Sequence, residues 1–170
     1  MDEIGEAQNL SPGKGLMILL YVVAAIGVYI GIARALGVQT LYGGFLFSLY
    51  FGAIKTLDPP EFLPSVLGSV GGVLVASLSH ILPVQFGAAG YAVALVAIMI
   101  GVYASIMGWV PILINNAFLL FLTVATIPAL QAEADFTGAA ASVLIVAAMM
   151  GGLVLALRAV NRRNMGLPAE

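Results

Sequence analysis

No Asp, Glu, Lys or Arg interrupts the stretch from Phe62 to Ala132, which reads FLPSVLGSVGGVLVASLSHILPVQFGAAGYAVALVAIMIGVYASIMGWVPILINNAFLLFLTVATIPALQA. At roughly 20 residues per crossing, this stretch alone could cross a bilayer about three times. The whole chain of 170 residues is 62% hydrophobic and 8% charged, and its mean hydropathy is +1.11. A soluble fold would need a polar shell that so few charged residues cannot supply. The composition therefore predicts an integral membrane protein.

Six apolar segments follow one another along the chain, and none shows the polar-apolar alternation of a β-strand. We therefore expect an all-α protein with six membrane segments. They cover approximately residues 16–36, 39–54, 62–82, 88–108, 110–129 and 137–157.

The breaks between these segments carry turn and loop signals. Residues 55–61 form a charged, proline-containing loop, and residues 131–135 form a short acidic loop. Pro83 and Gly87 predict a tight turn without charge. Pro111 suits the first turn of a new helix, and Trp109 suits a membrane interface.

Basic residues predict the orientation, because they usually stay on the cytoplasmic side. Residues 1–15 are expected to form an acidic cytoplasmic tail, 16–157 a single membrane domain, and 158–170 a basic cytoplasmic tail. The acidic start differs from the basic start of a signal peptide, so we expect the first segment to be retained. Only Arg34 opposes this orientation. The basic residues that it places in the cytoplasm are Lys14, Lys55, Arg158, Arg162 and Arg163.

The phrase IGVYIGI at Ile26–Ile32 returns as IGVYASI at Ile100–Ile106, 74 positions later. Phe45-Leu46 likewise returns as Phe118-Leu119. A Gly-Gly pair occurs in both the third and the sixth segment, so the three matches follow the same order in both halves of the chain. Small and apolar residues recur by chance in membrane proteins, so the matches favour an internal repeat without proving it.

Repeat units of about 16–82 and 88–157 would each contain three segments. An odd number of crossings forces the second unit to enter from the opposite side, which predicts a three-plus-three inverted repeat. Such repeats are frequent in transporters and channels, where the solute site lies near the bilayer centre.

The second and fifth segments carry the candidate solute-binding or pore residues. Tyr42, Gly43 and Gly44 open the second segment, and Asn115 and Asn116 lie at the corresponding place in the fifth. Glycine pairs weaken a helix and asparagine amides bind polar groups, so both helices are expected to be short or broken. The asparagines could line a solute path or could instead join neighbouring helices.

His80, near the end of the third segment, is a further candidate for the path, although a structural hydrogen bond is an alternative role. No second ligand stands near it at metal-binding spacing, and we expect neither a metal nor a cofactor. The sequence also lacks a phosphate-binding glycine loop, paired carboxylates and an activated nucleophile, so we do not expect an enzyme. The chain has no cysteine.

Residues 40–157 resemble the small YcdZ-like inner-membrane protein family of bacteria. The resemblance rests on FLFSLYFGA before a charged loop, on a glycine-rich third segment, on GYAVALVAIMIG, and on the Trp109-Val110-Pro111 turn. It implies a compact bundle of five or six helices in the bacterial inner membrane and no particular substrate. The longer first segment with its acidic tail departs from the family pattern.

These observations predict a passive channel or facilitator for a small neutral solute or small ion. Secondary pumps usually bind their driving ion at an intramembrane ionisable group, and the charge-free stretch offers no carboxylate. An ion-coupled transporter and a non-transporting partner subunit of a larger membrane complex remain the alternatives. We expect a homo-oligomer surrounded by lipid, with no nucleic-acid partner.

Overall fold

The computed structural model describes residues 11–133 and 135–164. These residues form helices joined by loops, and no β-strand occurs among them. Much of the acidic tail predicted for residues 1–15, and the end of the basic tail predicted for 158–170, lie outside the described residues. The chain divides into two compact units after Gly37, and each unit is described by itself.

Among the described residues, three helices are long and apolar enough to cross a membrane. They occupy Pro12–Ala35, Pro59–Ile106 and Phe136–Ala156. The predicted all-helical fold is therefore confirmed for the described part of the chain. The length and composition of the three helices support an integral membrane protein.

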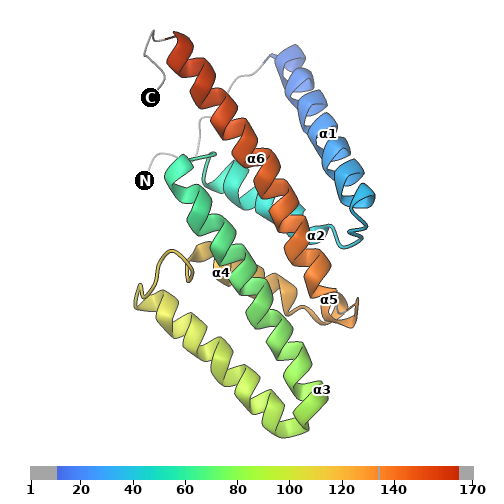
Figure 1. Ribbon diagram of the computed structural model, residues 1–170, viewed down its shortest axis with the longest axis vertical. Coiled ribbons are helices and arrows are strands. Elements are labelled where there is room, and N and C mark those ends of the chain that lie inside the picture. Colours follow the sequence, from blue (N-terminus) through green and yellow to red (C-terminus); the bar gives the residue numbers. More distant parts are fainter. Residues whose placement is uncertain (1–10, 134, 165–170) are drawn as a thin grey trace. The chain divides into compact units, whose positions relative to one another are not determined.

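The first unit contains helix α1, Pro12–Ala35 (Figure 1). Pro12 suits the first helical position, where its missing N–H has no helical partner to lose. The helix contains 24 residues, which at 1.5 Å per residue gives roughly 36 Å, enough to cross a hydrocarbon core of about 30 Å. The chain then turns at Gly37, which has a φ of 76°.

The second unit begins with two short helical segments. Helix α2, Tyr42–Phe47, continues directly into a π-helix, η1, Ser48–Ile54. Together they extend roughly 20 Å, less than the thickness of the hydrocarbon core. Phe47 and Phe51 anchor them, since both rings are fully buried and stack with centroids 5.8 Å apart. A short 3-10 helix, η2, Pro59–Glu61, leads into the next helix.

Helix α3, Phe62–Ile106, is folded into two arms, 62–86 and 88–106, which meet at a sharp bend (Figure 1). Gly87 forms the bend with φ 58° and ψ −133°, a conformation that side chains strongly disfavour. Pro83 removes a backbone donor one turn earlier. A Cβ atom at Gly90 would overlap the carbonyl oxygen of Leu82. The bend lies where the sequence predicted a tight turn.

The second arm of α3 exposes many large apolar side chains, which water would solvate poorly and lipid would solvate well. They include Val93, Leu95, Val96, Met99 and Ile100.

Three more helices complete the unit: α4, Asn116–Ala125; α5, Pro128–Glu133; and α6, Phe136–Asn164. The prediction that a helix begins near Pro111 was wrong. The chain from Gly108 to Ile114 forms turns, with Val110 at a φ of 48°, and Asn115 is the residue that caps α4. A loop was also predicted for 131–135, but α5 covers most of it, because a proline at the first helical position readily starts a helix.

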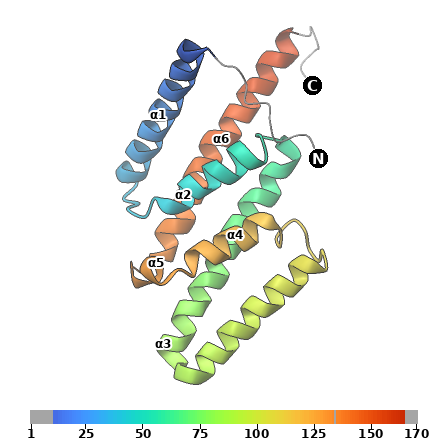
Figure 2. The ribbon, with the colours of Figure 1, turned by 180° about the vertical axis from the view of Figure 1, so that it is seen from behind.

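The short helices pack on long helices from the other half of the chain. Seen from behind, Figure 2 shows α2 lying along α6, and α4 against the first arm of α3. Both contacts bring backbones close together. A Cβ atom at Gly43 would overlap the carbonyl oxygen of Ala139 in α6, and one at Gly72 in α3 would overlap that of Phe118 in α4.

The buried positions of these helices recur at a spacing of 74 residues, which is also the spacing of the two IGVY phrases. In the long helices, five buried positions of the first α3 arm each have a buried counterpart in α6. These pairs are Ser65 and Ala139, Gly68 and Ser142, Ser69 and Val143, Gly72 and Val146, and Val73 and Ala147. In the short helices, the buried pairs are Gly43 and Ala117, Gly44 and Phe118, Phe47 and Phe121, and Phe51 and Ala125.

We predict that Gly72→Ala lowers the free energy of unfolding by about 1–3 kcal/mol, because the added methyl group must push the α4 backbone away. Gly152→Ala is the matched control, since a Cβ atom there meets nothing within 4 Å. Both variants gain the same helix propensity. Thermal unfolding in detergent measures the difference, and equal stability of the two variants would contradict the close α3–α4 packing.

Candidate functional site

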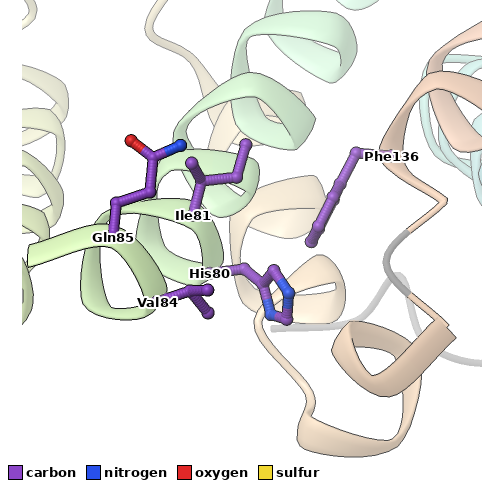
Figure 3. Close-up of a pocket in the computed structure, with 5 residues that line it drawn as sticks. All are labelled: His80, Ile81, Val84, Gln85 and Phe136. Carbon is purple, nitrogen blue, oxygen red and sulfur yellow. The ribbon is translucent and has the colours of Figure 1, made fainter. Parts of the chain in front are cut away.

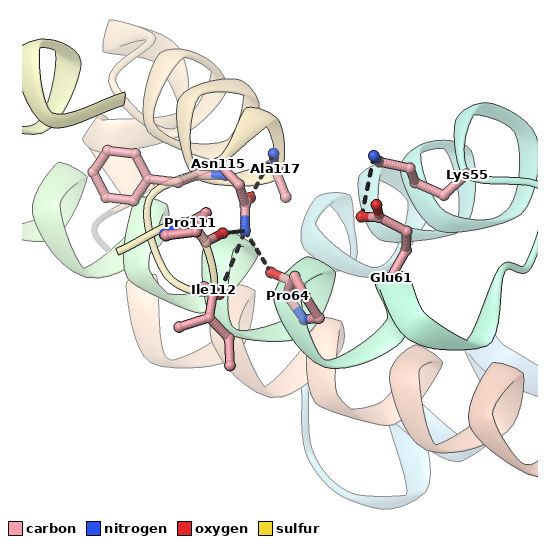
Figure 4. A network of polar contacts seen from close by, with 8 residues as sticks. Lys55, Glu61, Pro64, Pro111, Ile112, Asn115 and Ala117 are labelled. Atoms are coloured by element: carbon pink, nitrogen blue, oxygen red, sulfur yellow. Dashed lines mark hydrogen bonds and ion pairs between the residues drawn. The ribbon is translucent and has the colours of Figure 1, made fainter. Parts of the chain in front are cut away.

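Asn115 joins three parts of the second unit through its side chain (Figure 4). Its Oδ1 accepts hydrogen bonds from the backbone N–H groups of Ala117 at 2.9 Å and Phe118 at 3.2 Å, which caps α4. Its Nδ2 donates to the carbonyl oxygen of Pro64 in α3 at 2.8 Å. The same nitrogen lies 3.1 Å from the carbonyl oxygen of Pro111 in the preceding loop. The amide therefore fixes the start of α4 against the first turn of α3.

Asn116, the other predicted asparagine, is exposed at the first position of α4. The two neighbours thus differ in what they can do. The amide of Asn115 is engaged by protein groups, whereas the amide of Asn116 is accessible to water or a solute.

Gly43 and Gly44 lie at the close contact between α2 and α6. The backbone N–H of Gly44 donates to the Ser142 hydroxyl at 3.0 Å, and this hydroxyl donates to the carbonyl oxygen of Ala139 at 2.7 Å. Both glycines and Ser142 are buried. Because a short helix leaves its first N–H groups without helical partners, Ser142 supplies one of the acceptors that α2 lacks.

Asp135 performs a related role at the start of α6. Its carboxylate accepts hydrogen bonds from the Thr40 hydroxyl and from the Gly138 N–H, the latter at 2.9 Å. The Thr40 hydroxyl, followed by the Gly138 N–H, holds the pKa of Asp135 below its ordinary value. Tyr42, the third predicted residue of α2, is half-buried and lies within electrostatic range of Asp135 and Glu133.

His80 lines an open pocket of about 290 Å³ near the far end of the first α3 arm (Figure 3). Its ring lies 5.7 Å from that of Phe136, the first residue of α6, between centroids. Ile81, Val84 and Gln85 complete the lining. One residue before His80, the Ser79 hydroxyl accepts a hydrogen bond from the Gln131 side chain at 3.0 Å.

The predicted residues therefore form two groups rather than one site. Asn115 and Asn116 lie beside the start of α3, whereas Tyr42, Gly43, Gly44 and His80 are associated with the start of α6. Along the first α3 arm, the twelve positions from Gly68, beside Asn115, to His80 correspond to roughly 18 Å. A solute contacting both groups would have to move through much of the membrane.

An ion pair lies close to the asparagine group (Figure 4). Lys55 Nζ is 3.1 Å from Glu61 Oε2, and the hydrogen bond with Glu61 raises the pKa of Lys55. The pair closes the loop between η1 and α3, whose Thr56 and Leu57 have φ values of 50° and 59°. Paired charges of this kind neutralise one another and stabilise a protein only modestly.

Two residues near these groups, Asp135 and Ser65, were not predicted from the sequence. Asp135 carried a usable signal, because an aspartate just before an apolar run is a typical helix cap. Ser65, a buried serine of α3, carried none, since nothing local distinguishes it from the serines around it.

No family model, curated protein or solved structure matches the chain. The resemblance to the YcdZ-like family therefore stays a prediction.

We predict that Asn115→Ala destabilises the protein by about 1–2 kcal/mol, because α4 loses its cap and its bond to Pro64. Asn115→Asp should recover part of this loss, since a carboxylate still caps the helix but cannot donate. Asn116→Ala is the control and should leave stability nearly unchanged. Thermal unfolding in detergent ranks the variants, and an Asn116→Ala effect as large as that of Asn115→Ala would refute the capping role.

We also predict a pH-dependent effect of Thr40→Val. The folded-state pKa of Asp135 is depressed, so its stabilisation is complete above the unfolded-state pKa of about 4 and disappears as pH falls through the folded-state value. Thr40→Val should therefore cost about 1 kcal/mol at pH 7, after allowance for the partial exposure of Asp135, and less near pH 2. Unfolding midpoints measured across this range test the prediction.

Thr123→Val is the control for that series, because the Thr123 hydroxyl bonds only to the Leu119 carbonyl, at 2.8 Å. Its effect should not change with pH. If the effect of Thr40→Val on the unfolding midpoint is also independent of pH, the Thr40 hydroxyl does not stabilise the Asp135 carboxylate.

Proposed function

We propose that the protein is a passive facilitator that lets a small neutral solute cross the bacterial inner membrane. The observation that carries the proposal is that each of two short helices packs on a long helix from the other half of the chain, α2 on α6 and α4 on α3. Short helices that end inside the membrane place helix ends and polar side chains where solutes bind in many transporters. Simple membrane anchors have no need of them.

In the proposed topology, the chain crosses or enters the membrane six times as a three-plus-three inverted repeat. The 74-residue spacing supports this topology, because it relates the two IGVY phrases and also the buried positions of α2 with α4 and of the first α3 arm with α6. A pseudo-twofold axis in the membrane plane would exchange the two short helices. Both termini would then lie in the cytoplasm.

A neutral solute is favoured by the scarcity of charged residues around α4 and the first α3 arm. The sequence from Phe62 to Ala132 has no acidic or basic residue apart from His80, and the nearby Lys55 and Glu61 bind each other. A bare ion would leave its hydration shell at a large energetic cost here, whereas a neutral molecule could exchange hydrogen bonds with hydroxyls and amides. Passive flow is favoured over pumping for the same reason.

We also propose that the protein is a homo-oligomer, because one chain of this length has few helices with which to surround a solute path. The exposed apolar side chains of the second α3 arm could contact either lipid or another subunit. Crosslinking in the membrane would separate these possibilities.

Stopped-flow light scattering of reconstituted liposomes tests the function with water, urea, glycerol and small salts. We expect one neutral solute to enter several-fold faster than it enters protein-free liposomes, and salts to show no acceleration. Asn116, which is exposed, and Tyr42, which is half-buried, are the first residues of α4 and α2 and lie 74 positions apart. Asn116→Leu and Tyr42→Phe each remove a polar group there and should slow the flux without loss of folding. Gly152→Ala serves as the unaffected control.

Absence of flux for every solute, from protein that is folded and monodisperse, would refute the facilitator. If a different chain then co-purified with the protein, a partner subunit would be the better explanation. Flux that required a proton or sodium gradient would instead indicate an ion-coupled transporter.

A further inference from the structure

Ser65 carries a buried hydroxyl that lacks a hydrogen bond. Its side chain is 1% exposed, and among the described residues its Oγ is the buried side-chain atom for which no hydrogen-bond partner exists. The neighbouring buried serines differ: Ser69 donates to the carbonyl oxygen of Ser65 at 2.7 Å, and Ser142 bonds to both Ala139 and Gly44. A buried hydroxyl without a protein partner is costly unless a water or another small molecule supplies the hydrogen bond.

The position of Ser65 on α3 follows from the helical repeat. Residues 65, 68, 72 and 76 lie on one face of the helix, being separated by three or four positions. Gly68 contacts Asn115, Gly72 contacts Phe118, and Ala76 belongs to a buried cluster with Phe118 and Leu122. This face packs on α4, so Ser65 extends it by one turn towards the start of α4.

Other polar groups lie around the same place. Asn115 donates to the carbonyl oxygen of Pro64, the residue just before Ser65 (Figure 4). The hydroxyl of buried Tyr50 lies against the backbone of Ala117, the second residue of α4. Lys55 and Glu61 lie within electrostatic range of Tyr50 but bind each other. The surroundings of Ser65 are thus polar but uncharged apart from an ion pair, and the Asn115 amide there is already bound to protein groups.

We propose that the Ser65 hydroxyl binds the permeating solute where α4 begins, and that this solute is a small neutral molecule with both hydrogen-bond donors and acceptors, of the size and chemistry of urea. A hydroxyl suits such a ligand because it can donate and accept at once. The counterpart of Ser65 at the 74-residue spacing is Ala139, which cannot do either. The binding position therefore belongs to one half of the chain. The inference rests on the proposed facilitator function.

Cysteine labelling tests the site independently of flux, because the chain contains no native cysteine. Ser65→Cys, Ser69→Cys and Thr56→Cys are reconstituted and treated with iodoacetamide, a small neutral amide. Alkylation requires a thiolate, which forms only with access to water, so Ser65→Cys should react roughly tenfold or more faster than the equally buried Ser69→Cys. Exposed Thr56→Cys is the positive control. Urea should slow the labelling of Ser65→Cys.

Labelling of Ser65→Cys as slow as that of Ser69→Cys, while Thr56→Cys reacts, would overturn the inference and leave a trapped water as the partner of this hydroxyl. Labelling that urea does not slow would equally refute a urea-like ligand.

Ser65→Ala provides the second measurement. It should reduce solute flux several-fold without lowering the unfolding midpoint, because the methyl group removes only an unbonded hydroxyl. Ser69→Ala should lower the midpoint, since it breaks a buried hydrogen bond. Normal flux through Ser65→Ala refutes the binding role while keeping the facilitator. No flux through the unmodified protein refutes the facilitator, and the labelling then decides whether a water-borne molecule reaches Ser65.

Discussion

Backbone N–H and C=O groups inside a bilayer must find partners within the protein, because hydrocarbon offers none. This constraint bears on α2 and α4, which are too short to cross the bilayer and which begin beside the starts of α6 and α3. At α4, the Asn115 side chain accepts hydrogen bonds from two backbone N–H groups. At α2, the Ser142 hydroxyl accepts one from the backbone N–H of Gly44. Each of these short helices therefore begins at a polar side chain, which comes from the adjacent residue for α4 and from a residue of α6 for α2.

The same side chains connect distant parts of the chain. Asn115 reaches α3, and Thr40 reaches the start of α6, so each short helix is held by a long helix that is remote in sequence. Glycines make this arrangement possible, since Gly43 and Gly72 allow backbones to approach closely where any side chain would overlap a carbonyl group. Polar caps and small residues therefore occur together at these contacts.

Local sequence signals predicted much of the fold. Composition identified the helical membrane class, and Pro83 with Gly87 marked the bend in α3, because both effects act within a few residues. The start of α4 was misplaced, since Pro111 is a strong helix signal but the helix begins after Asn115. The candidate residues could be chosen by their chemical type, but the partners of their side chains could not. Asn115 binds a carbonyl oxygen 51 positions away, and no local pattern reveals such a contact or the unbonded hydroxyl of Ser65.

The bend at Gly87 also bears on how the chain is inserted into a membrane. Neither arm of α3 carries a charged residue, so neither has an orientation signal of its own. We expect the arms to enter the bilayer together, as a hairpin whose direction is inherited from Lys55 before it and from the arginines in the last turns of α6. A few basic residues outside an uncharged hairpin would then decide which side of the membrane the polar groups of the hairpin face.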